Sequence, residues 1–176
     1  MSLLNESTLE NATGEIKEVF NEVLEKRGMV PNGLRLWSVN PEALKMQWEN
    51  VKKMLSKEPE DQKLMHIIRY LAAYKNDSKY CINLAGKILI KNFGFTEDML
   101  TEIKVLPSVA PLAKKQKALL IFAIKSISNA DDINAEDIAL LKDLGISEME
   151  MFDIVRSASQ MYVVNTLFKT FKVKDD

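Results

Sequence analysis

Apolar residues recur at spacings of three and four along almost the whole chain, and this period limits the possible folds more than any other feature. Between residues 13 and 27 the repeat is carried by Ile16, Val19, Phe20, Val23 and Leu24. Such spacing places apolar side chains on one face of an α-helix. No segment alternates apolar and polar residues between turn residues, so we predict no strands. The sequence therefore predicts an all-α fold.

Capping residues, proline and glycine divide this pattern into about eight helices. The helices are expected to begin at or just after Thr13, Pro41, Pro59, Ser78, Thr96, Pro111, Asn134 and Ser147. The segment MVPNGLRLWSVNP (29–41) reads as a loop or short irregular turns, because it holds two prolines and a Pro-Asn-Gly turn signal. The last helix is expected to extend to about Phe171, which makes it long enough to contribute to an interface between chains.

Two segments, FGFTEDMLTEI (93–103) and LGISEMEMFDI (144–154), match in the order of their residue types. Each has a glycine, an apolar residue, a Thr or Ser cap and a glutamate, and each follows an apolar helix. This order fits an internal repeat of a helix-Gly-cap-helix unit. It fits equally well two helix connections that share only their capping chemistry.

The composition is that of an ordinary globular protein, with 47% hydrophobic and 28% charged residues in a chain of 176. We expect a single domain over 1–176, with residues 1–12 as an N-terminal extension. The 24 basic and 25 acidic residues leave a net charge of −1, which gives no attraction to nucleic acid or to an anionic membrane. No apolar run is long enough to span a bilayer, and the first residues lack a signal-peptide pattern, so a cytoplasmic location is expected.

The chain has one cysteine, Cys81, and one histidine, His66. A single cysteine forms no internal disulfide, and this pair is too few for a structural zinc site, so we expect no metal and no cofactor. Cys81 lies in the first turn of its helix if Asp77 or Ser78 is the cap, and a helix N-terminus favours a thiolate. Cys81 also shares an apolar stripe with Leu84, as a buried and inert cysteine would. Both interpretations stay open.

The order of several motifs resembles the alkylhydroperoxidase D-like family, which includes carboxymuconolactone decarboxylases and peroxidase-related proteins. The motifs are Val30-Pro31-Asn32, the helix start at Pro41, Asn76 before Tyr80-Cys81, Leu-x-x-Leu-Gly-Ile-Ser (141–147) and Asn165 near the end of the last helix. The resemblance covers about residues 14–173. It implies an all-helical domain, a core helix pair over 59–105 that carries the active-site motif, and a homo-oligomer.

The family's active-site motif, Cys-x-x-Cys-x-x-x-His with a glutamate on the preceding helix, is degenerate here. The second cysteine falls on Cys81, but the first falls on Ser78, the histidine on Ala85 and the glutamate on His66. A hydroxyl neither forms a sulfenate nor resolves one, so the family's dithiol cycle is chemically excluded. Peroxide handling would depend on one cysteine and an external reductant.

The resemblance implies an antioxidant oxidoreductase in which Cys81 attacks a small-molecule peroxide, His66 is its partner, and an external thiol is the reductant. One alternative is a catalytically inactive helical oligomer that acts as a binding or interaction scaffold. Another is an enzyme similar to carboxymuconolactone decarboxylases, with an altered pocket that includes His66, Arg69 and Tyr70. The residues expected to line the pocket are Arg69, Tyr70, Ala73, Ser78, Tyr80 and Ala85.

Overall fold

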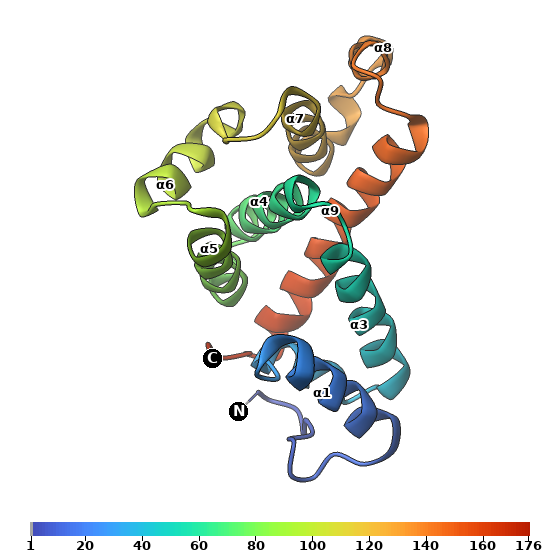
Figure 1. Cartoon of the computed structure of the whole chain (residues 1–176), viewed down its shortest axis with the longest axis vertical. Coiled ribbons are helices and arrows are strands. Elements are labelled where there is room, and N and C mark those ends of the chain that lie inside the picture. The colour runs from blue at the N-terminus through green and yellow to red at the C-terminus, as the bar shows by residue number, and fades with distance from the viewer. Residues whose placement is uncertain (1) are drawn as a thin grey trace. The chain divides into compact units, whose positions relative to one another are not determined.

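The computed structural model describes residues 2–176, which form nine α-helices, two short 3₁₀ helices and no strands (Figure 1). The elements in chain order are α1 (Gly14–Arg27), α2 (Asn32–Trp37), α3 (Pro41–Leu55), α4 (Pro59–Lys75), α5 (Lys79–Phe93), α6 (Glu97–Val105), η1 (Pro107–Val109), α7 (Lys114–Ser128), η2 (Ala130–Asp132), α8 (Ala135–Asp143) and α9 (Glu148–Thr170). The predicted all-α fold is confirmed.

Four of the polar residues predicted to cap helices do so. Asn40 Oδ1 accepts a hydrogen bond from the Ala43 amide at 3.1 Å, and Thr96 Oγ1 accepts one from the Met99 amide at 3.2 Å. Asn134 begins α8 with a capping box. Ser147 begins α9 in the same way, because its amide donates to the Glu150 carboxylate and its hydroxyl accepts from the Glu150 amide. Local sequence thus defines where these four helices begin.

Three local expectations were wrong. The segment predicted as a loop contains α2, which begins after Pro31, whose carbonyl accepts from the Leu34 and Arg35 amides. Helix α7 begins at Lys114 and not at Pro111, because Glu60 accepts a hydrogen bond from the Ala113 amide just before the helix. The apolar repeat after Pro41 predicts that Leu55 lies on the inner face of its helix, but Leu55 is 37% exposed at the end of α3.

The two segments that suggested a repeat share their local backbone conformation. Gly94 and Gly145 both have a φ of 70°, which glycine adopts without the strain that a Cβ would add. In each case the capping residue, Thr96 or Ser147, follows two positions later. Shared capping chemistry explains this match, and an internal repeat stays a prediction.

The chain divides into two compact units. The first comprises the residues up to Lys57 together with Leu167–Asp176. Its core joins α1 to α3 around Trp48, which is 1% exposed and packs with Phe20, Val23 and Leu44. Trp48 Nε1 donates to Glu22 Oε2 at 2.8 Å, so the indole has a polar partner although its ring is buried. The expectation of one domain over 1–176 remains a prediction.

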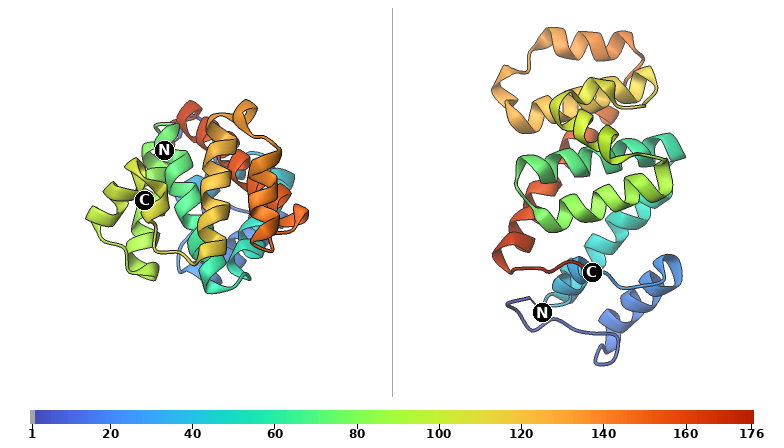
Figure 2. Two further views of the ribbon diagram at one scale, coloured as in Figure 1. Left: turned by 90° about the horizontal axis from the view of Figure 1, so that it is seen from above. Right: turned by 90° about the vertical axis from the view of Figure 1, so that its left-hand side faces the viewer.

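The second unit, Glu58–Thr166, is organised around α4, which packs against α5, α6 and α7. Helices α4 and α5 run antiparallel and side by side (Figure 2). Gly86 of α5 faces the Tyr70 ring and Leu100, because a Cβ at this position would lie in ordinary van der Waals contact, 3.5 Å from each. In the described part of the chain, no helix is long and apolar enough to cross a membrane.

Candidate functional site

The turn between α4 and α5 joins the two packed helices that carry the predicted site residues. The Asp77 amide donates to the Tyr74 carbonyl at 3.1 Å and the Ser78 amide donates to the Ala73 carbonyl at 2.9 Å. With Asp77 at a φ of 49°, this is a Schellman motif that ends α4. The same turn presents Ser78 as the residue before α5. Two helices can therefore run antiparallel with only Asn76–Ser78 between them.

Ser78 occupies the N-cap position of α5 but does not cap it. Its side chain makes no hydrogen bond to the backbone of the first helical turn, although serine is a preferred residue for that purpose. It is 1% exposed. Its hydroxyl instead forms a hydrogen bond with the Cys81 thiol. The residue that the resemblance aligns with the family's first cysteine thus interacts with Cys81.

Cys81 lies in the first turn of α5 and is 6% exposed. Burial raises the pKa of its thiol above the ordinary value of 9.0, because the thiolate loses hydration. The hydrogen bond from Ser78 and the positive charge of Arg69 act in the opposite direction and are the smaller effects. The lowered pKa expected from a helix N-terminus is therefore not found, and the thiol is mainly protonated at neutral pH.

His66 lies on α4, is 4% exposed and packs its ring against Phe93 of α5, with a centroid distance of 5.6 Å. The groups that shift the pKa of Cys81 are Ser78 and Arg69, and His66 is not among them. The proximity of His66 to the thiol stays a prediction, whereas Arg69, expected only as a pocket residue, acts on Cys81 through its charge.

The remaining predicted residues lie on the two facing helices. Ala73 belongs to α4, and Tyr80 and Ala85 belong to α5; all three are buried. The buried Tyr70 ring packs near Gly86, and Lys104 Nζ lies 5.5 Å from the ring centroid. The role of these residues as the lining of one pocket stays a prediction. Within residues 2–176, no three His, Cys, Asp or Glu side chains gather as metal ligands would.

Asn165 is a polar residue whose place in the site was not predicted. It lies in α9, is 1% exposed, and its Nδ2 donates to the Ala72 carbonyl in the last turn of α4, at 3.5 Å. In the sequence, Asn165 is notable only as part of the pattern that resembles the family. The signal that could have identified it is an amide within the apolar stripe of the last helix, among Met161 and Val164.

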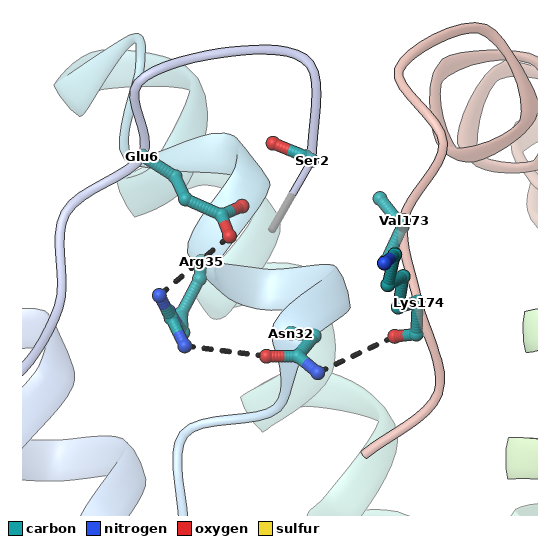
Figure 3. A pocket seen from close by; sticks show the side chains of 6 residues that line it. All are labelled: Ser2, Glu6, Asn32, Arg35, Val173 and Lys174. Carbon is teal, nitrogen blue, oxygen red and sulfur yellow. Dashed lines mark hydrogen bonds and ion pairs between the residues drawn. The ribbon is translucent and has the colours of Figure 1, made fainter.

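A small cavity of about 40 Å³ lies in the first unit (Figure 3). It is lined by Ser2, Glu6, Asn32, Arg35, Val173 and Lys174. Arg35 Nη2 lies 3.6 Å from Glu6 Oε1, and Asn32 Nδ2 donates to the Lys174 carbonyl at 3.3 Å. These contacts hold the segments before α1 and after α9 on α2. The volume accommodates water-sized molecules.

The comparison with solved structures identifies the fold. The chain superposes with a TM-score of 0.82 on a protein from Ralstonia eutropha JMP134, described as an alkylhydroperoxidase AhpD core and an uncharacterized peroxidase-related protein. The sequences are 20% identical, and the match covers 99% of this chain and 92% of the other. This chain has the AhpD-like fold.

A second match is an uncharacterized peroxidase-related protein from Silicibacter sp. TM1040, with a TM-score of 0.81 and 22% identity. It covers 99% of this chain and 92% of that one. No protein-family model matches the sequence, and a search of curated proteins found no match. The similarity to these structures therefore concerns the fold, and any chemistry depends on this chain's own residues.

Proposed function

We propose that this AhpD-like protein handles peroxides through one cysteine. The observation that carries the proposal is the environment of Cys81, where the Ser78 hydroxyl forms a hydrogen bond with the sulfur and Arg69 supplies a positive charge. Both groups stabilise an anion on sulfur, and a hydroxyl can also donate to a sulfenate oxygen. A cysteine that served only for packing would require neither the Ser78 hydroxyl nor the Arg69 charge.

The reaction proceeds in two stages. The Cys81 thiolate attacks one oxygen of a small peroxide, the O–O bond breaks, and the leaving hydroxide or alkoxide takes up a proton. Sulfur loses two electrons and becomes a sulfenate. An external low-molecular-weight thiol then forms a mixed disulfide and releases water, and a second such thiol restores Cys81 while the two reductant molecules become a disulfide. His66 is a candidate acceptor of the thiol proton.

Burial sets the expected rate. Because the pKa of Cys81 is raised, only a small fraction of the protein carries the thiolate at neutral pH. The thiol is 6% exposed, which favours small peroxides over bulky ones. We therefore expect slow oxidation that accelerates as the pH rises.

The test is oxidation of the native protein by hydrogen peroxide, followed by a dicarbonyl reagent that traps sulfenates and by mass spectrometry of the Cys81 peptide. Trapping in the native protein, absent from a Cys81→Ser variant and reversed by glutathione, supports the proposal. A Cys81 that is oxidised only after unfolding in urea contradicts it. A His66→Gln variant then tests the proton acceptor, since its removal should slow oxidation without changing how the pKa of Cys81 responds to Ser78→Ala.

A second candidate is a binding scaffold without redox activity, forming a homo-oligomer. The burial of Cys81 favours it, because an enclosed and mainly protonated thiol is typical of a packed cysteine. This candidate predicts that Cys81→Ala leaves peroxide tolerance and assembly unchanged. Mass measurement of the native assembly, with and without peroxide, separates the two candidates.

A further inference from the structure

The carbonyl of Ala72 accepts two hydrogen bonds at the end of α4. One comes from the Asn76 amide at 3.1 Å, and the other comes from Asn165 Nδ2 of α9 at 3.5 Å, 93 residues further along the chain. The Asn76 amide is the ordinary helical partner of this carbonyl, and the oxygen has a second lone pair that can accept from a donor outside the helix. Asn165 therefore supplies a long-range donor where α4 ends and the turn to α5 begins.

A buried asparagine is energetically unfavourable at position 165. The side chain is 1% exposed, and its Oδ1 is buried and accepts no hydrogen bond from residues 2–176. An amide that uses only its donor in the core costs free energy compared with an apolar residue of similar size. Its neighbours on α9, Met161 and Val164, are buried and apolar. The stabilising group of Asn165 is therefore its Nδ2 donor, which binds the Ala72 carbonyl.

The turn that Asn165 contacts leads directly to the thiol. Asn76 shares the Ala72 oxygen with Asn165, Asp77 takes the left-handed conformation, and the Ser78 amide closes the turn on the Ala73 carbonyl. Ser78 then directs its hydroxyl to Cys81 and not to the backbone of α5. The direction of that hydroxyl depends on where the turn holds Ser78.

We propose that Asn165 is a positioning residue for Cys81, which fixes the end of α4 so that the Ser78 hydroxyl faces the thiol. An effect of Asn165 on peroxide oxidation rests on the proposed function, whereas an effect of Asn165 on the Cys81 thiol is independent of that function. Asn165 acts through Ser78, so removing either donor should have the same consequence for Cys81.

The experiment measures the pKa of Cys81 from the NMR shift of its isotope-labelled β-carbon, which reports the thiol whether or not reagents reach it. The variants are Asn165→Leu, which keeps the size and removes the donor, Ser78→Ala, and both together. Val164→Ala is the matched control, because it removes a buried side chain next to Asn165 on α9. Asn165→Ala serves in place of Asn165→Leu if leucine does not fit the site.

We expect Asn165→Leu and Ser78→Ala each to raise the pKa, with an about threefold to tenfold smaller thiolate fraction at a fixed pH, as the loss of one hydrogen bond predicts. The double variant should match Ser78→Ala, and Val164→Ala should leave the pKa unchanged. The proposal is overturned if the Asn165 variants leave the pKa unchanged, if Ser78→Ala does, or if Val164→Ala raises it equally. If the pKa shifts as expected while peroxide fails to oxidise native Cys81, the positioning role stands and the proposed function falls.

Discussion

The hydroxyl of Ser78 forms a hydrogen bond with the thiol of Cys81, three residues further along the chain, and leaves the first turn of α5 uncapped. The two side chains therefore interact at the positions that the family resemblance aligns with two cysteines. The spacing is that of a Cys-x-x-Cys pair, although the sequence has a cysteine only at the second position.

Ser78→Cys should give a disulfide with Cys81. The hydrogen bond already brings the two side chains together, so little backbone movement is needed. We expect mild oxidation to remove two hydrogen atoms from the mass of the variant and to leave its unfolding cooperative. Ser126→Cys is the control, since Ser126 donates to the Phe122 carbonyl within α7. An equal yield of disulfide in both variants would contradict the prediction.

Stability should fall at alkaline pH because of Cys81. Burial raises the pKa of this thiol in the folded state above its ordinary value of 9.0, so the unfolded chain releases the proton at lower pH. The contribution of the protonated thiol to the free energy of unfolding is complete at a pH below the pKa of Cys81 in the unfolded chain. This contribution is lost as the pH rises toward the pKa of Cys81 in the folded state. We expect urea unfolding to show a steeper loss of stability from about pH 8 to about pH 10 in the native sequence than in Cys81→Ala. Parallel curves for the two proteins would show that the thiol is not responsible.

Asp77→Gly should stabilise the protein. Asp77 has a φ of 49°, a conformation that glycine adopts without strain. Relief of that strain should raise the free energy of unfolding by up to about 1 kcal/mol. The converse control is Gly145→Ala, where φ is 70° and an added Cβ meets no atom within 4 Å, so only backbone strain changes. That variant should be less stable by about 1 kcal/mol. Urea unfolding measures the stability of both variants. If Asp77→Gly is less stable than the native sequence, interactions of the aspartate side chain contribute more to stability than the relief of backbone strain.

Glu150→Gln should lower stability at neutral pH and have little effect in acid. Lys115 Nζ lies 2.8 Å from Glu150 Oε1, and the Ser147 amide and hydroxyl donate to Oε2, which together lower the pKa of Glu150 from 4.5 to about 2. The stabilisation is present above pH 4.5 and is lost as the pH falls toward 2. Because the side chain is 38% exposed, solvent limits the effect to about 1 kcal/mol or less.

The control for this variant is Glu148→Gln. Glu148 pairs with Lys142 at 2.6 Å but is 78% exposed, so its removal should change stability less than Glu150→Gln does. Urea unfolding of both variants at neutral and acidic pH tests this order. An equal loss at both pH values for Glu150→Gln would indicate that its geometry, and not its charge, is what stabilises the start of α9.

The parts of the fold that depend on neighbouring residues could be predicted from the sequence. Asn40, Thr96 and Ser147 cap the helices that follow them, because capping is decided within one helical turn. The start of α7 could not be predicted in this way. It depends on Glu60, 53 residues earlier, which binds the Ala113 amide.

The site shows the same limit. The sequence predicted Cys81, Ser78 and Arg69 as site residues, but a helix N-terminus and burial shift a thiol pKa in opposite directions. Only the packing of α5 against α4 decides that burial is the larger effect. The contact of Asn165 with Ala72 was also beyond local patterns, since it joins residues 93 positions apart. The resemblance indicated which family groups have no counterpart in the sequence, whereas the tertiary structure shows that Ser78 and Arg69 act on the Cys81 sulfur.

The short connection between α4 and α5 also bears on the order of folding. Only Asn76–Ser78 separate the two helices, so their pairing closes a very short loop and costs little chain entropy. During synthesis from the N-terminus, this helical hairpin is complete long before α9 leaves the ribosome. The thiol is then sheltered early by its own hairpin, and Asn165 docks late onto a turn that has already formed.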